Sequence, residues 1–555
     1  MTTVDAAESL IDPEPAMRQS DGADEGHPYR DILKSSALIG ASTAINIVFG
    51  IVRTKALAVI LGPAGYGVYG GFSVVADLAK NVAQFGINSS GVRQVAAASA
   101  SGDRADLSRT VRVLRIAAVV SALVGALAMC LVAGPVSRLT FGNDHYTGSM
   151  ALLAIAVLLG VLASGEIALL QGLRRIADLA RINVFGAFLG TAASIPLVFL
   201  FGERGIVPSL AIVAGASTLL AWRYGTRVPV EPAPLTLRQT VAESSQLFRL
   251  GFVFMCSSLL TLGAAYVVRV ILLRSLGPEA AGLYQAAWTL GGLYIGFVLQ
   301  AMGTDFYPKL VVAAADNAQC NRLVNEQARV SLLLSIPGVM GTLTLAPLVI
   351  DLFYARTFGG ATEVLRWVCL GMALRVLTWP LGYIAVAKNR QRLFFATDLL
   401  WTIANVALTW VCVARWGTAG AGMAFFGSYI FHWTMVYPIA RHLSGFRWSR
   451  SNALLTAAFL SLMAIVFVSN YVLPPAVATA GGLVEHLVKL NDKVGAGQKV
   501  AVQRDSFGEV VAEYASGVAG EITGLRSDAM SEPGNPLVFI LFNKPEPEDV
   551  QAYPE

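Results

Sequence analysis

Charged side chains are scarce in this chain of 555 residues: Asp, Glu, Lys and Arg make up 14% of it, against 55% hydrophobic residues. This scarcity excludes an ordinary soluble protein, whose composition is about 25% charged. A mean hydropathy of +0.60 predicts a polytopic membrane protein instead. Cysteines number only five and show neither a CxxC pair nor metal-ligand spacing, so we expect small buried hydrophobic side chains.

Nucleotide and metal motifs are also absent from the sequence. No Gly-x-x-x-x-Gly-Lys-Ser/Thr run occurs, which excludes ATP hydrolysis by a P-loop and leaves an ion gradient or the substrate as the energy source. The five histidines are scattered among a tail, loops and apolar runs, and this scatter predicts no zinc site. We therefore expect no cofactor, no metal, no catalytic residues and no nucleic-acid partner.

Apolar residues are gathered in long runs between about residues 34 and 472. Most runs are near the roughly 20 residues with which one helix crosses a bilayer. The thirteen runs are 34–61, 65–92, 110–133, 147–171, 176–200, 204–224, 249–275, 279–307, 328–354, 363–387, 392–414, 418–440 and 452–472. Residues 1–29 are polar and acidic, and we expect a disordered tail there rather than a signal peptide.

A long-range repeat relates the first twelve runs. Leu61-Gly62-Pro63 returns as Leu276-Gly277-Pro278, and the same offset of 215 residues carries Gly202 onto Gly417. Six crossings return a chain to its starting side, so both copies have the same orientation. The sequence thus predicts an all-α polytopic membrane protein with two six-helix lobes in parallel repeat, as in alternating-access transporters. The expected parts are the tail 1–29, an N-lobe 30–226, a C-lobe 227–445, a thirteenth transmembrane helix 446–473 and a small all-β barrel-like domain 474–555.

Basic residues are concentrated in every second loop. Examples are Arg174 and Arg175 after the fourth run, and Lys388 and Arg390 after the tenth. Short cytoplasmic loops carry an excess of Lys and Arg, so these loops and the N-terminus are expected on the cytoplasmic side. An odd number of spans then leaves the C-terminal part outside.

Ionisable side chains within the runs are the candidate functional residues, because each costs roughly 2.5–3.5 kcal/mol to insert. Cations outnumber anions there, which favours an anionic substrate such as a pyrophosphate. For each residue the alternative is a structural role, either pairing with backbone carbonyls or extending toward the interface. The candidates for substrate binding are Arg53, Asp77, Lys80, Arg269 and Arg375, and those for ion coupling are Glu166, Asp305 and Asp398.

Several motifs carry a resemblance to a known family. They include Lys34-Ser35-Ser36, the repeated Leu-Gly-Pro and Phe306-Tyr307-Pro308-Lys309-Leu310. Over about residues 30–470 the chain resembles the polysaccharide flippases of the multidrug/oligosaccharidyl-lipid/polysaccharide exporter superfamily. This resemblance implies ion-gradient-coupled transport of a polyprenyl-pyrophosphate-linked O-antigen or exopolysaccharide unit across the bacterial inner membrane. It also implies that cationic cleft residues hold the pyrophosphate, and that membrane lipids, a polysaccharide polymerase and glycosyltransferases are partners.

The last 83 residues, 473–555, differ in composition, with twelve acidic and six basic side chains. Short alternating runs at 483–488 and 507–511, separated by glycine-rich turns, predict a small β barrel or sandwich. This segment is similar to the C-terminal barrel of the succinylglutamate desuccinylase/aspartoacylase zinc hydrolases, without their zinc ligands. It is either an appended module that binds a partner outside the membrane or the end of an unrelated gene joined to a transporter.

Two other functions remain open at this point. A drug or small-molecule exporter of the same superfamily would favour acidic residues in the membrane, against the observed excess of Arg and Lys. A membrane protein with a deacylase-derived interaction module is the second alternative. An enzyme is not expected, because the sequence lacks both the zinc ligands of a deacylase and the soluble domain with an acidic pair that a glycosyltransferase needs.

Overall fold

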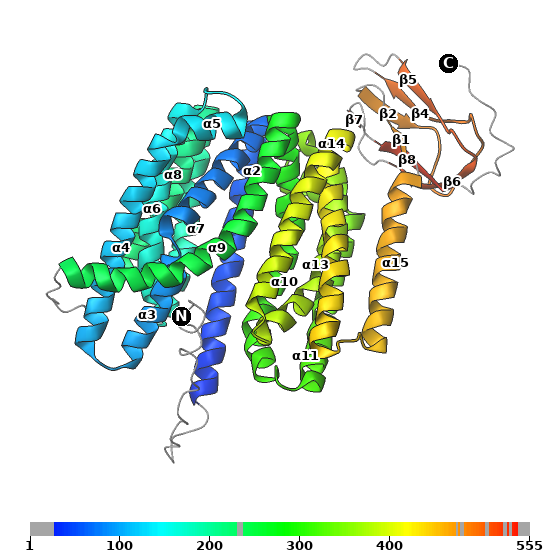
Figure 1. The fold of residues 1–555 in the computed structure, drawn as a ribbon. Helices are drawn as coiled ribbons and strands as arrows, with labels where there is room; N and C mark the ends of the chain where they lie inside the picture. Colours follow the sequence, from blue (N-terminus) through cyan, green and yellow to red (C-terminus); the bar gives the residue numbers. More distant parts are fainter. Residues whose placement is uncertain are drawn as a thin grey trace. The chain divides into compact units, whose positions relative to one another are not determined.

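The computed structural model describes residues 27–229, 237–472, 475–477, 482–504, 510–525, 530–531 and 536–541. The described residues are mainly helical up to residue 472 and include all the strands beyond it (Figure 1). It divides into two compact units, Met1–Arg274 and Ser275–Glu555. The expected all-α membrane part followed by a small β part is therefore confirmed.

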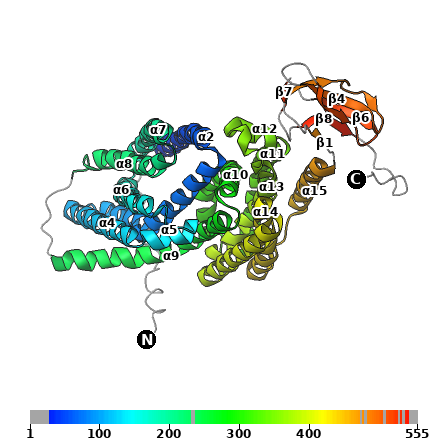
Figure 2. The ribbon, with the colours of Figure 1, turned by 90° about the horizontal axis from the view of Figure 1, so that it is seen from above.

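The first unit is made of helices with short connections. They are α2 (His27–Gln84), α3 (Ile87–Ala100), α4 (Arg104–Leu131), α5 (Ala133–Phe141), α6 (Thr147–Gly172), α7 (Ile176–Phe201), the 3-10 helix η1 (Gly202–Gly205), α8 (Ile206–Gly225) and α9 (Leu237–Ser275). Within this unit α6 lies between α4 and α8 and packs against both (Figure 2). Side chains such as Phe72 of α2 and Leu153 of α6 form the core at this contact.

The second unit also begins with helices. They are α10 (Pro278–Val312), α11 (Asn317–Thr344), α12 (Ala346–Phe353), the 3-10 helix η2 (Arg356–Phe358), α13 (Ala361–Ala387), α14 (Gln391–Ser444) and α15 (Arg450–Val472). Helix α13 is the central one, since 72% of its most apolar stretch is buried and it packs against α10, α11 and α14. A helix that is apolar on all sides is typical of such a central position.

Eight helical segments of the described chain are long and apolar enough to cross a membrane, or nine if α11 and α12, bent by 86°, form one span. Three of these segments are 45, 50 and 54 residues long, about twice what one crossing needs. Each contains a glycine with positive φ, at Gly62, Gly202 or Gly417. The boundaries between neighbouring expected runs fall at these bends.

The internal repeat is visible in the backbone of each unit. Gly62 (φ 64°, ψ −179°) corresponds to Gly277 (φ 87°, ψ 178°). Gly202 (φ 57°, ψ −133°) corresponds to Gly417 (φ 58°, ψ −138°). Positive φ is easily adopted only by glycine. The two halves of the chain therefore bend at equivalent residues with nearly the same angles, as the 215-residue repeat predicts.

Gly62→Ala is expected to lower the stability of the protein by about 1–3 kcal/mol, the cost of a side chain in this backbone region. No atom lies within 4 Å of the position that the added Cβ would take, so the cost comes from the backbone alone. Thermal unfolding of the purified protein in detergent measures the effect. Gly40→Ala is the matched control: this glycine is helical and also has open space around it, so alanine there is expected to be neutral or stabilising. Equal unfolding temperatures for Gly62→Ala and wild type would contradict the bend.

The sequence predicted a small β barrel or sandwich, and the described C-terminal strands form two antiparallel four-stranded sheets rather than a closed barrel. One sheet has the order β1-β8-β6-β3 and the other β5-β4-β2-β7. Their core includes Val500, Ile522 and Val538, and His486 Nε2 bonds to the carbonyl oxygen of Leu537 in the other sheet at 3.1 Å. The strands are β1 (Pro475–Val477), β2 (Gly482–His486), β3 (Lys493–Val494), β4 (Lys499–Arg504), β5 (Val510–Ala515), β6 (Gly520–Leu525), β7 (Met530–Ser531) and β8 (Pro536–Leu541).

Candidate functional site

Three of the charged candidates are brought together in the first unit by α2 and α9. Asp77 and Lys80 lie three residues apart on α2, one helical turn, and Arg269 lies on α9. Both cations interact electrostatically with the Asp77 carboxylate. Charged side chains in membrane segments usually pair in this way. We call Asp77, Lys80 and Arg269 the charged group.

Hydrogen bonds join α9 to α2 and to α5. Asn81 Nδ2 donates to Ser258 Oγ at 3.0 Å, one residue beyond Lys80. Further along α9, the Tyr266 hydroxyl lies 2.9 Å from Thr140 Oγ1 of α5. A hydrogen bond between helices is retained in a membrane because hydrocarbon offers no competing water. Arg269, one turn after Tyr266, is held in place by these contacts.

The aliphatic stem of Lys80 packs over a buried glycine of α6. A Cβ added at Gly160 would lie 3.1 Å from Lys80 Cδ and 3.4 Å from its Cε. Contacts of this length leave no room for a larger side chain unless the lysine moves. Gly160 thus allows the stem of Lys80 to lie across α6.

Arg269 also bonds to its own helix. Its Nη1 donates to the Ala265 carbonyl oxygen at 3.1 Å, the backbone pairing that was the structural alternative for this residue. A guanidinium has five N–H donors, and this bond uses one of them. The backbone contact orients Arg269 along α9.

Arg53 lies at a different place in the first unit. It lines a cavity of about 220 Å³ together with Asn46, Asn183, Thr191 and Ser217. The walls come from α2, α6, α7 and α8, and these five side chains are all polar. The structure therefore separates Arg53 from the charged group, although Asp77 and Lys80 also lie on α2.

Glu166, a candidate for ion coupling, is held by an arginine that the sequence interpretation missed. Arg115 Nε donates to Glu166 Oε1 at 2.7 Å, and its Nη2 donates to Oε2 at 3.1 Å. The same Nη2 donates to the Gly225 carbonyl oxygen at 3.0 Å. Arg115, Glu166 and Gly225 thus join α4, α6 and α8. No local signal reveals the pair, since its members are 51 positions apart.

The remaining candidates belong to the second unit. Arg375 of α13 and Asp398 of α14 both interact electrostatically with Tyr429 of α14, whose side chain is buried. The ring of His432 packs edge-on against Tyr429 at 5.8 Å. These contacts bring two predicted residues close to one tyrosine. The side chain of Asp305 lies outside the described residues.

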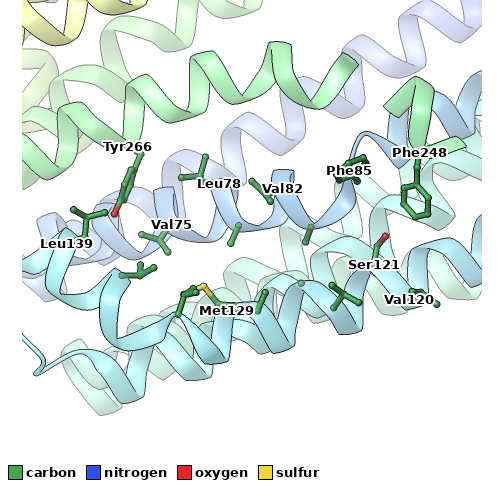
Figure 3. A pocket seen from close by; sticks show the side chains of 17 residues that line it. Val75, Leu78, Val82, Phe85, Val120, Ser121, Met129, Leu139, Phe248 and Tyr266 are labelled. Carbon is green, nitrogen blue, oxygen red and sulfur yellow. The ribbon is translucent and has the colours of Figure 1, made fainter. Parts of the chain in front are cut away.

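An apolar cavity of about 790 Å³ lies in the first unit (Figure 3). Its walls come from α2, α4, α5 and α9 and the turns between them, and among the described lining residues only Ser121 and Tyr266 have polar side chains. Figure 3 shows Val75, Leu78 and Val82 of α2 pointing into it. Sequence analysis did not foresee this cavity, because an apolar face that lines it looks the same as one that faces lipid.

The known proteins that resemble this chain are named as flippases or transporters. The chain is 25% identical over 431 residues to the lipid III flippase of Escherichia coli strain K12, covering 73% of this chain and 97% of that protein. It shares its fold with an inward-facing multidrug resistance MATE family transporter of the MOP superfamily (TM-score 0.62, 13% identity, covering 72% of this chain and 95% of that one). It also shares its fold with the lipid II flippase MurJ in an inward closed conformation (TM-score 0.58, 14% identity, covering 78% and 98%).

A family match carries the assignment further than these similarities do. Residues 56–363 match the family described as polysaccharide biosynthesis protein, and this range is more than half of the 555 residues. It includes the whole charged group and both Leu-Gly-Pro segments. With its long apolar helices, the chain is a multi-pass membrane protein that belongs to the polysaccharide biosynthesis protein family.

Proposed function

We propose that this protein is a flippase that moves a lipid-linked oligosaccharide across the membrane by alternating access. It is a transporter rather than an enzyme. Membership of a polysaccharide biosynthesis family, together with similarity over 97% of the length of a lipid III flippase, carries the proposal. Such a protein leaves its substrate chemically unchanged, so it needs a complementary binding site within its membrane helices rather than catalytic groups.

The charged group suits the phosphate part of such a substrate. We assign the pyrophosphate to Lys80 and Arg269, since guanidinium and ammonium groups form short, charge-assisted hydrogen bonds to phosphate oxygens. Asp77 balances these cations electrostatically when no substrate is bound. Arg53 and Arg375 are proposed as further anion-binding residues, because each is a cation within an apolar run.

Among the candidates for ion coupling we favour Asp398. Both carboxylate oxygens of Glu166 accept hydrogen bonds from Arg115, so a proton or sodium ion would have to displace a bidentate guanidinium. Asp398 and Arg375 both interact electrostatically with Tyr429, so binding of an ion at Asp398 changes the charge beside this tyrosine. Asp305 is retained as a candidate from its position in the sequence.

The proposed location is the bacterial cytoplasmic membrane, with a cytoplasmic N-terminus. The loops rich in Lys and Arg support this orientation. Residues 30–226 and 227–445 are proposed as the two lobes, and a polysaccharide polymerase and glycosyltransferases as partners. The similarity of the β part to a zinc hydrolase barrel stays a prediction.

Expression of the full chain in a bacterial strain that lacks its own flippase is expected to restore surface polysaccharide. A chain truncated after residue 472 is expected to restore it equally well, because the charged group and the family match lie before that residue. Surface polysaccharide is measured by immunoblot of cell extracts, alongside the amount of each protein in the membrane. Restoration by the full chain alone would make the β sheets a working part of the transporter.

A small-molecule exporter is the second candidate, because the MATE transporter shares the fold with a TM-score of 0.62. The same strain distinguishes the two. Increased resistance to cationic drugs without surface polysaccharide, at normal membrane levels of the protein, would replace the flippase proposal with this one.

A further inference from the structure

Three aromatic side chains of the second unit lie together where α10 packs against α13. The ring centroids of Trp379 and Tyr383, one turn apart on α13, are 4.8 Å apart, and the ring of Tyr307 of α10 lies 5.7 Å from that of Tyr383. The buried ring of Phe306 lies 5.9 Å from both Trp379 and Tyr383. We call Tyr307, Trp379 and Tyr383 the aromatic platform. It rests on the hydrophobic core of this unit, against which Trp379 and Tyr383 pack.

Part of the aromatic platform is open. Tyr307 is 38% exposed, and the two rings on α13 are half-buried in a helix that is otherwise well buried. Within the described stretch 371–385, the positions that are not buried are Arg375, Trp379, Gly382 and Tyr383. They recur at intervals of three and four residues, which places them on one face of the helix. Arg375 and the two rings therefore share the open face of α13.

The position of Arg375 shows what this face meets. Arg375 lies near the middle of α13, a helix long and apolar enough to cross a membrane. Charged side chains at such a depth face the protein interior or a water-filled cavity, because contact with hydrocarbon is costly. Belts of Trp and Tyr that face lipid lie at the membrane interface instead. The open face of α13 is thus turned toward a polar space.

The internal repeat shows that the fold does not require these rings. Its offset of 215 residues carries Ser164 onto Trp379 and Ala168 onto Tyr383. Both small residues belong to α6, which occupies in the first unit the place that α13 has in the second, and both are buried. Rings needed only for helix packing would be expected in both copies. Their presence in one copy alone points to a task that the two halves do not share.

We propose that the aromatic platform binds a sugar ring of the lipid-linked oligosaccharide. The inference rests on the proposed function and adds a subsite to it. The C–H faces of a sugar ring are apolar and pack on aromatic rings, while its hydroxyls form hydrogen bonds, and tyrosine offers both a ring and a hydroxyl. Arg375, one turn before Trp379, is a proposed anion-binding residue. A sugar joined to a phosphate can therefore contact both.

The test compares two probes on the purified full chain in lipid nanodiscs: a polyprenyl pyrophosphate, and the same lipid carrying a glucose trisaccharide. Affinities are measured by displacement of radiolabelled polyprenyl pyrophosphate. The wild-type chain is expected to bind the glycosylated lipid at least about threefold more tightly. Trp379→Leu and Tyr307→Leu are expected to lose this preference and to bind the sugar-free lipid as the wild type does.

Two control variants accompany them. Trp379→Phe keeps an aromatic ring and is expected to retain most of the preference. Trp410→Leu removes a tryptophan of α14 that is 67% exposed and lies outside the aromatic platform, so its preference is expected to equal that of the wild type.

The ratio of the two affinities separates sugar binding from a structural role of the rings. Equal affinity of the wild type for both lipids would overturn this proposal alone, whereas binding of neither lipid would count against the flippase proposal as well. A preference that survives in both leucine variants would reduce the rings to packing. Tyr307 is outside the core cluster, so Tyr307→Leu decides the matter if Trp379→Leu does not fold.

Discussion

Replacing Lys80 or Arg269 with alanine is expected to lower glycan export at least tenfold while the protein still reaches the membrane. Hydrogen bonds to charged groups contribute about 1.5–3 kcal/mol each, and about 1.4 kcal/mol corresponds to a factor of ten in binding. The double variant is expected to export no measurable glycan. The measurement is the initial rate at which surface polysaccharide appears after induction, divided by the amount of protein in the membrane.

Two controls separate phosphate binding from a general effect of lost charge. Arg269→Lys keeps the charge but loses the planar fork, so partial export is expected. Arg138→Ala removes a cation whose ion pair with Asp144 is well exposed, at 70% and 57% of the two side chains, and such pairs contribute little. If both Lys80→Ala and Arg269→Ala export glycan at the wild-type rate, the assignment of the charged group to the substrate site is wrong.

Glu166→Ala or Arg115→Ala is expected to lower the unfolding temperature clearly. Their bidentate contact joins α4 to α6, and Glu166 is only 13% exposed, so either substitution leaves a charge without its partner. An unsatisfied buried group costs about 1–3 kcal/mol, and more when it is charged. Thermal unfolding of the purified variants, compared with wild type, measures this effect.

A combined variant distinguishes a structural role of this pair from ion coupling. Arg115→Met with Glu166→Leu replaces both charges by apolar groups, and such replacements of buried ion pairs are often neutral or stabilising. Recovery of stability together with normal glycan export would assign the pair to structure. If stability returns but export stays lost, Glu166 takes part in coupling and our preference for Asp398 is wrong.

Gly225 offers an independent check on the same contact. A Cβ added at this glycine would collide with the Glu166 carboxylate, while the Gly225 carbonyl oxygen accepts a hydrogen bond from Arg115. Gly225→Ala is therefore expected to lower the unfolding temperature with both charged residues still present. A stable Gly225→Ala variant would mean that the glutamate can move aside.

The positions of the membrane helices were predictable because bilayer thickness sets the length of an apolar run. The runs at 363–387 and 452–472 match Ala361–Ala387 and Arg450–Val472 within two residues. The repeat also predicted the bends, since Gly-Pro and paired glycines end one helix and begin the next. Local composition and residue spacing therefore predict where the helices lie and where they bend.

Tertiary contacts between distant residues were not predictable in this way. A spacing of three residues puts Asp77 and Lys80 one turn apart on a helix, as the sequence alone shows. The approach of Arg269 depends instead on how α9 packs against α2. The first compact unit extends to Arg274 and so includes α9, whereas the sequence suggested a lobe boundary after residue 226. The Asn81–Ser258 hydrogen bond joins residues whose relation no periodicity shows.

The paired bends also bear on how the two halves of this chain could diverge after a duplication. Most positions of a membrane helix accept many apolar side chains, so two copies of one segment can lose nearly all visible identity. Gly62 and Gly277, like Gly202 and Gly417, have positive φ in both copies, where any other residue strains the backbone. We therefore expect these four glycines to change less than other helix positions when two such copies diverge.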